Sequence, residues 1–226
     1  MIRILDPVSS VPNVTFTQSR IRMLSYLSSN DIDTSLELDS HDDTCVIGKY
    51  CLILNDHERN VTVYDYDRAL GAQSFCTVSA ILGYIDPKSG QTYHLVIHQA
   101  IKIPHLGHSL LCPMQFRMNG VEINETPRFL EKNNTPNSCA IVIDDPYPTS
   151  NATVTLPLSL SGVTSYSPVH QPSLEDWDSG KYPPYELTSE HLDWNPSDPT
   201  FGFQSRCSLV SSYRGYFTES QSSKDG

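Results

Sequence analysis

The sequence lacks the features that mark two broad classes of protein. No two lysine or arginine residues are adjacent, and the 226-residue chain carries a net charge of −11. This distribution argues against a nucleic-acid-binding surface, because such surfaces neutralise phosphates with clustered basic side chains. No stretch reaches the roughly 18 apolar residues that a membrane-spanning helix needs. We therefore expect neither nucleic acid nor a membrane as a direct partner.

Cysteines at metal-binding spacing are also missing. The six cysteines are scattered, with no Cys-x-x-Cys pair and no cysteine–histidine cluster at zinc spacing, which argues against a structural zinc site. The opening run Met1–Leu5 is broken at once by Asp6-Pro7, which does not match a secretion signal. We therefore expect free thiols in a reducing, cytoplasmic setting, and neither a metal nor a cofactor.

Changes in composition divide the chain into four segments. Residues 1–34 are rich in Ser, Thr and Asn and predict a flexible leader. Residues 35–125 carry strand patterns, and residues 126–167 predict a small β-rich appendage. From residue 168 onward Pro, Ser, Asp and Glu predominate, and we expect a mostly extended or disordered tail.

Local patterns within residues 35–125 predict hairpins and one short helix. Two β-rich runs are joined by residues 86–90, with Pro near the front and Gly at the end, which indicates a hairpin. The apolar run 46–54 and the alternating run 61–64 predict another hairpin, closed by a polar turn at 55–60. Pro113 followed by Asn-Gly predicts a helix over 113–118.

The segment 35–48 offers the strongest candidate for a reactive group. An alternating apolar run ends at Leu38 and delivers Asp39 into a polar turn, and a second apolar run, Cys45–Ile47, leaves that turn. A carboxylate buried there is costly unless it has a use, and the hydroxyl of Ser40 is able to orient it. An acidic turn on the surface fits the same residues, because Asp and Ser dominate turns.

Other candidate groups carry weaker signals. The tripeptide beginning at Asp178 reads Asp-Ser-Gly but has no apolar strand on either side. His94 and His98 share one face of a predicted strand, where a role on the sheet surface is expected. Cys112 precedes a proline at the predicted helix start, and we expect a buried structural thiol there.

The order of these parts resembles the aspartic protease of retroelements, the retropepsin fold, and most closely its copia-type branch. Asp39-Ser40-His41-Asp42 lies on the first family motif, which reads Asp, Ser or Thr, Gly, and a small residue. Leu110-Leu111, with Gln115 and Phe116 after it, lies on the second landmark, a pair of aliphatic residues before a helix. The resemblance spans roughly residues 35–125. It implies an all-β, retropepsin-like closed β-barrel with one short helix, followed by the small β-rich C-terminal appendage.

The resemblance also implies an activity. Family members hydrolyse peptide bonds with two aspartates that share a proton, and this chain offers one well-placed aspartate. It therefore implies a homodimer that processes its own polyprotein, in the cytoplasm or within virus-like particles, with Asp39 of each protomer as the catalytic group and Ser40 bracing the two turns. The implied substrate-binding residues are His41, Asp43, Leu70 and Gly71, the last two in the flap.

Two departures from the motif leave alternatives open. His41 stands where Gly is usual, and Asp42 adds a third carboxylate where a small residue is usual. A catalytically inactive dimerisation or peptide-binding module derived from a retroelement is therefore the second hypothesis. A structural β-protein unrelated to proteases is the third, and it would be favoured if Leu110-Leu111 packed far from Asp39.

Overall fold

The computed structural model describes residues 33–40, 42–64, 71–144, 153–196 and 198. The chain divides into two units, residues 1–193 and 194–226. The described part of the second unit is short and includes one turn, in which the Asp198 amide donates to the Asn195 carbonyl. All strands and helices below belong to the first unit, where strands dominate and helices are few and short. The all-β prediction is confirmed.

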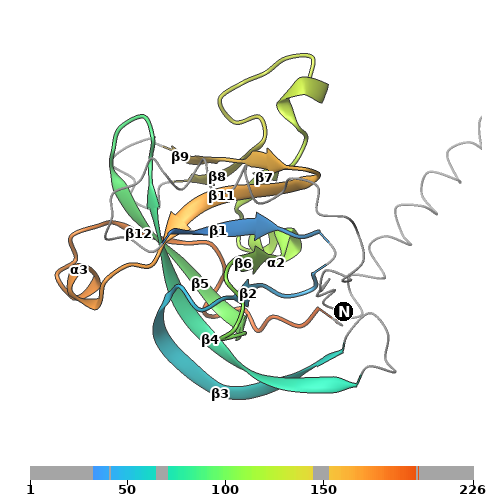
Figure 1. The fold of residues 1–226 in the computed structure, drawn as a ribbon, viewed down its shortest axis with the longest axis vertical. Coiled ribbons are helices and arrows are strands. Elements are labelled where there is room, and N and C mark those ends of the chain that lie inside the picture. The colour runs from blue at the N-terminus through green and yellow to red at the C-terminus, as the bar shows by residue number, and fades with distance from the viewer. Residues whose placement is uncertain (1–32, 41, 65–70, 145–152, 197, 199–226) are drawn as a thin grey trace, which may run out of the picture. The chain divides into compact units, whose positions relative to one another are not determined.

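The main sheet contains nine strands (Figure 1). Eight of them follow the order β10-β11-β1-β6-β2-β5-β4-β3, and β12 pairs with β5 off this path. In chain order the nine strands are β1 (Asp33–Leu38), β2 (Val46–Ile47), β3 (Leu52–Tyr64), β4 (Ala72–Ile85), β5 (Thr92–Lys102), β6 (Ser109–Leu111), β10 (Ser159–Ser161), β11 (Thr164–His170) and β12 (Pro184–Glu186).

Strand β1 lies between two strands that are distant in sequence. It runs parallel to β6, with Leu38 opposite Leu111, and antiparallel to β11, with Leu36 opposite Ser167. Strand β11 also pairs with β4 at one position, where His170 is opposite Gly83. Parallel neighbours require a long crossover connection. The position of β1 is therefore set by contacts that no local sequence pattern encodes.

Strands β3 and β4 form a long antiparallel hairpin that extends to the pair Tyr64 and Ala72. The predicted turn at 55–60 is wrong, because these residues continue a single strand, β3. The register of β3 against β4 shifts twice, between Ile53 and Asn55 and between Asp56 and Asn60. Bulges of this kind absorb extra residues and bend a strand without ending it. The polar residues that resembled a turn therefore lie in a bulged, bent strand.

Two local predictions are confirmed. Strands β4 and β5 form a hairpin, and its turn is closed by the Asp86 amide donating to the Gln91 carbonyl at 2.9 Å. Helix α2 (Pro113–Met118) begins with proline and ends before Asn119-Gly120. Both elements carry their signals within a few residues, which is why the sequence identifies them.

A second, three-stranded sheet consists of β7 (Glu122–Asn124), β8 (Ala140–Asp144) and β9 (Thr153–Pro157), in that order. Ile123, Ile141 and Leu156 are buried in it. The short 3-10 helix η2 (Arg128–Leu130) lies between β7 and β8 in sequence. The division of the chain at residues 34, 125 and 167 stays a prediction. Strand β11 begins within the predicted appendage and pairs with β1 in the main sheet.

The stretch after residue 168, expected to be mostly extended or disordered, contains helix α3 (Leu174–Asp178) and strand β12. Ser173 caps α3 by accepting a hydrogen bond from the Asp176 amide. Tyr185 and Leu187 are buried, and Leu187 donates its amide to Val96 of β5. Two buried apolar side chains anchor this polar segment to the sheet.

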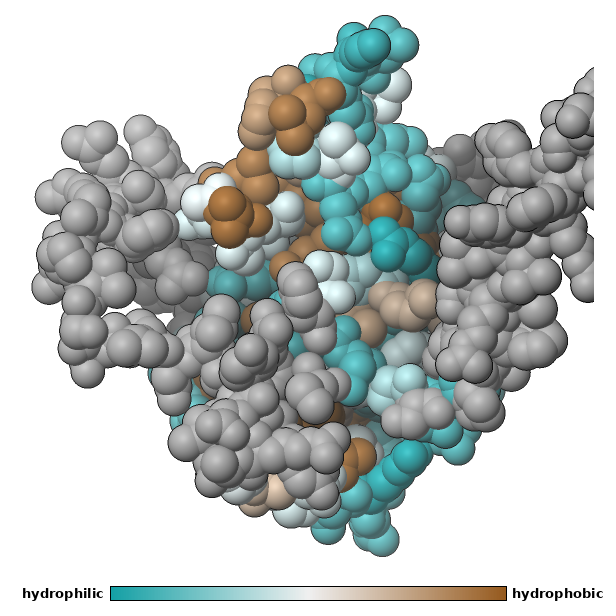
Figure 2. All heavy atoms as spheres, turned by 90° about the vertical axis from the view of Figure 1, so that its right-hand side faces the viewer, coloured by the Kyte–Doolittle hydropathy of each residue, from teal (hydrophilic) through white to brown (hydrophobic). Residues whose placement is uncertain are grey.

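One buried cluster of the core is aliphatic. Val46, Ile101, Ile103 and Leu110 form one buried cluster that joins β2, β5 and β6. On the surface, Phe129 and Leu130 of η2 are the most prominent adjacent apolar pair, with 77% and 64% of their surface exposed. Figure 2 shows apolar surface gathered on the upper part of one face. Within the described residues, no helix has the length or the apolar character to span a bilayer.

Candidate functional site

The acidic turn begins directly where β1 ends. The Asp39 amide donates to the Leu111 carbonyl at 3.1 Å, and the Asp42 amide donates to the Asp39 carbonyl at 3.2 Å. Because β1 and β6 are parallel neighbours, the first bond extends their pairing by one residue into the turn. The two sequence landmarks, the acidic turn and Leu110-Leu111, are therefore in direct contact.

A buried glutamine fixes the far end of the turn. Gln115 of α2 is 4% exposed, and its side-chain oxygen accepts a hydrogen bond from the Cys45 amide at 2.9 Å. Its side-chain nitrogen donates to the His98 carbonyl at 3.3 Å. Sequence reasoning placed this residue in the second landmark but assigned it no role. The available signal was a polar side chain beside Phe116, on the face of α2 that is buried.

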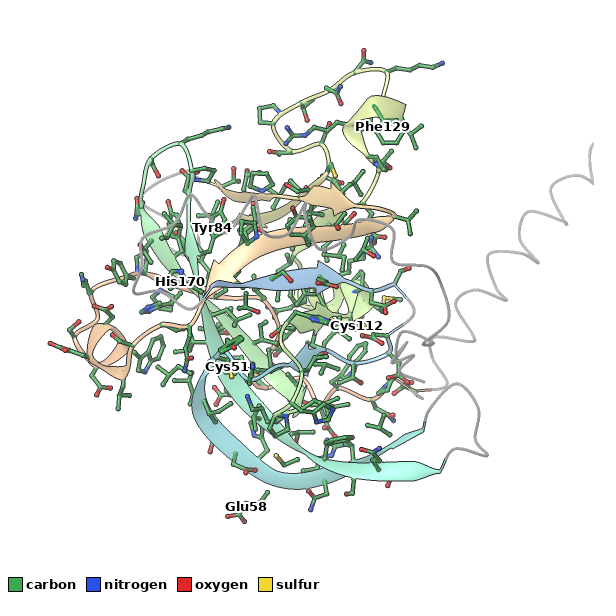
Figure 3. All side chains as sticks on the ribbon, viewed as in Figure 1. Cys51, Glu58, Tyr84, Cys112, Phe129 and His170 are labelled. Carbon is green, nitrogen blue, oxygen red and sulfur yellow. The ribbon has the colours of Figure 1, made fainter. Side chains whose placement is uncertain are left out.

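Two thiols lie where the acidic turn ends and helix α2 begins. Cys45 and Cys112 are both buried, and the Cys112 amide donates to the Cys45 sulfur at 3.3 Å (Figure 3 labels Cys112). Burial raises the pKa of both thiols, which keeps them protonated. Every cysteine in the described part of the chain is free. Cys112 is buried as predicted, and Cys207 lies outside the described residues.

Asp42 is the unexpected member of the turn. It is 4% exposed, and neither carboxylate oxygen has a hydrogen-bond partner among the described residues. Burial, with a smaller contribution from the neighbouring carboxylates Asp39 and Asp43, raises the pKa of Asp42 to about 8. Asp42 therefore carries a proton at neutral pH and adds no charge to the turn.

The predicted site residues that the structure describes lie in the acidic turn and just before β4. Asp39, Ser40 and Asp43 all belong to the acidic turn, with Ser40 exposed and the other two partly buried. Gly71 precedes β4, is exposed, and has a backbone φ of 97° that favours glycine. His41 and Leu70 lie outside the described residues. Within the described ranges no three His, Cys, Asp or Glu side chains are placed to hold a metal ion.

The two histidines of β5 are not on the sheet surface as predicted. His94 is 1% exposed and His98 is 6% exposed. His94 packs against Trp177 and Tyr182, with ring centroids 5.6 and 5.3 Å away, so that α3 and the residues after it cover this strand. The covering segment lies about 85 residues later in the sequence, beyond the reach of an alternation pattern.

His98 belongs to a hydrogen-bonded chain across three strands. The Ser79 hydroxyl lies 2.8 Å from Nδ1 of His98 and 2.9 Å from Nε2 of His57. A serine between two imidazoles resembles an activated nucleophile in composition. Ser79 is only 2% exposed, however, so its oxygen is not presented to a substrate. This chain links β3, β4 and β5 at the point where their registers shift.

The second Asp-Ser-Gly tripeptide does not form a comparable site. Asp178 ends helix α3, and Ser179 and Gly180 follow it in an exposed turn. The Ser179 hydroxyl donates to the Asp176 carbonyl. These contacts are local to the end of the helix, so the acidic turn at Asp39 remains the candidate site.

Comparisons with protein-family models, with curated proteins and with solved structures find no match to this chain.

Proposed function

We propose that the chain is an aspartic endopeptidase of the retropepsin type, with Asp39 as its catalytic group. The observation that carries the proposal is the hydrogen bond from the Asp39 amide to the Leu111 carbonyl. It joins two motifs that are far apart in sequence and that occur in the order that the resemblance implies. A protein in which these motifs lay apart would have favoured the third hypothesis, an unrelated structural protein.

Proton sharing explains why a second copy of the chain is needed. Two carboxylates about 3 Å apart do not both ionise easily, so the pair holds one proton between them. The ionised carboxylate takes a proton from the attacking water, while the protonated one donates to the carbonyl of the scissile bond. One chain supplies one Asp39. The proposal therefore requires a twofold dimer in which Asp39 meets its counterpart and Ser40 braces the two turns.

The protonated state of Asp42 supports this chemistry. A third ionised carboxylate beside the pair would make removal of the shared proton harder. With a pKa of about 8, Asp42 is neutral across the mildly acidic to neutral range in which such a pair works. The substitution of a small residue by Asp42 is therefore compatible with catalysis as long as its carboxyl stays buried.

Two features of the fold support the finer assignment of a barrel with a flap. Strand β11 pairs with β1 on one side and with β4 on the other, which is the connectivity expected of a closing sheet. The long β3–β4 hairpin carries Gly71 at its turn end, where a flap over the substrate is expected. Under this proposal the substrate is an extended polypeptide, including the polyprotein from which the chain derives.

Cleavage of a mixed peptide library between pH 4 and pH 8 tests the proposal. The purified chain is compared with an Asp39→Asn variant and with a control variant, Asp144→Asn, in which an exposed carboxylate of β8 is changed. We expect cleavage whose rate rises more than linearly with protein concentration, that is lost in Asp39→Asn and kept in the control. Cleavage that persists in a folded Asp39→Asn variant would refute the assignment.

The second hypothesis is a dimerisation or peptide-binding module without activity. It is favoured by the presence of Asp42 where the family motif has a small residue. A buried carboxyl without a partner in the described part of the chain is a cost that a catalytic turn does not require. A folded dimer that binds peptides but cleaves none would support this hypothesis. Sedimentation equilibrium on the same samples separates a dimer from a monomer.

A further inference from the structure

A lysine and a cysteine outside the acidic turn are in direct contact. The Lys102 ammonium nitrogen lies 3.1 Å from the sulfur of Cys51 and also donates to the Gly48 carbonyl. Cys51 is 6% exposed and immediately precedes β3, whereas Lys102 is the last residue of β5 (Figure 3 labels Cys51). Neither residue has a role in the function proposed above.

The surrounding backbone holds the two side chains in place. Strands β2 and β5 are parallel, with Ile47 opposite Lys102, and the Ile103 amide donates to the Ile47 carbonyl at 3.0 Å. On the other side, the Cys51 carbonyl accepts a hydrogen bond from the Gln171 side chain at 3.1 Å. Two side chains on fixed backbones meet far more often than two free reactants. The nitrogen and the sulfur are therefore preorganised to react.

We propose that Cys51 and Lys102 are a redox-sensitive cross-linking site, at which oxidation by a peroxide joins the two side chains through a sulfur–nitrogen bond. In the first step the thiolate sulfur attacks hydrogen peroxide, which gives a sulfenic acid and, with one proton, water. In the second step the neutral amine of Lys102 attacks that sulfur, the nitrogen loses a proton, and the sulfenic oxygen leaves as water. The cysteine sulfur is oxidised by two electrons, and the peroxide is reduced.

The electrostatics of the pair set the conditions for this reaction. Burial raises the pKa of the Cys51 thiol, and the neighbouring Lys102 charge partly opposes that shift. The reactive thiolate form of Cys51 becomes more abundant as the pH rises. The cross-link therefore forms faster at mildly alkaline pH than at neutral pH. Thiols that attack the sulfur of the product reverse it, as they reverse other sulfenyl derivatives.

The cross-link is tested by peptide mapping of the full-length chain after peroxide treatment at pH 8.5, with digestion under non-reducing conditions. We expect the peptide that contains Cys51 to be joined to the peptide that contains Lys102, at a mass two hydrogens below their sum. Trypsin does not cleave after a modified lysine, so cleavage after Lys102 is lost in the same species. Dithiothreitol restores both separate peptides.

Two conservative variants and one matched control decide the outcome. Lys102→Arg keeps the positive charge but removes the amine, and Cys51→Ser removes the sulfur. Both should abolish the linked species, whereas Cys76→Ser, which changes a half-buried cysteine of β4, should leave it unchanged. A linked species that survives in Lys102→Arg would be a disulfide and would overturn the proposal. Formation of Cys51 sulfinic acid without any link would also overturn it. The result of this experiment does not depend on whether the chain cleaves peptides.

Discussion

The buried carboxyl of Asp42 makes a quantitative prediction about stability. Its pKa in the folded chain is about 8, against an ordinary value of 3.8. Between these values the folded chain keeps a proton that the unfolded chain loses. Folding is therefore linked to proton uptake, and the free energy of unfolding falls as the pH rises through this window.

The size of the effect follows from the same values. Each unit of pH between about 5 and 7 should lower the contribution of Asp42 to the free energy of unfolding by about 1.4 kcal/mol. Replacing Asp42 with Asn removes the titrating group but keeps the shape of the side chain. Relative to the parent chain, the Asp42→Asn variant should therefore gain about 3 kcal/mol between pH 5 and pH 7. Above pH 8 the difference between the two proteins should stay constant.

Urea unfolding at half-unit steps from pH 5 to pH 9 measures this difference. The two proteins are compared at one protein concentration, so that any contribution from dimerisation is held fixed. Asp144→Asn serves as the control, because that carboxylate is exposed and should leave the dependence on pH unchanged. Parallel curves for the parent and for Asp42→Asn would refute the account of Asp42 as a protonated, buried acid.

Two further predictions concern the support of the acidic turn. Gly48→Ala should destabilise the fold by about 3 kcal/mol, because an added Cβ would lie 2.1 Å from the His108 carbonyl oxygen. Gly107→Ala is the control, because there is open space around Gly107. Equal urea midpoints for the two variants would contradict the prediction. Gln115→Leu should cost about 1–3 kcal/mol because it leaves the buried Cys45 amide without its acceptor. Met114→Leu, at an exposed position of α2, should be close to neutral in the same assay, and a similar loss in both variants would point to helix propensity instead.

The sequence predicted the elements whose signals are local. The β4–β5 turn and helix α2 carry proline and glycine at the positions that their geometry requires. The strand β3 was missed as a single element because bulges do not differ from turns in composition. The pairing of β1 with β6 was not predicted, since contacts between distant segments leave no periodic pattern.

The candidate site was predictable in outline but not in its charge state. Asp39 and its turn followed from a strand pattern that ends in polar residues. The burial of Asp42 depends on how the turn packs, and a sequence of three carboxylates does not indicate which one loses contact with water. The role of Gln115 was not predicted, because it depends on Cys45 and His98, which α2 approaches only in the folded chain.

The central place of β1 has a consequence for biosynthesis. This strand leaves the ribosome before its two partners, β6 and β11, and β11 ends at His170. Domains acquire such long-range pairings late, because the intervening chain must first be made. A nascent chain that stops short of residue 164 lacks the partner on one side of β1. The sheet that carries the acidic turn is therefore complete only after residue 170 has left the ribosome.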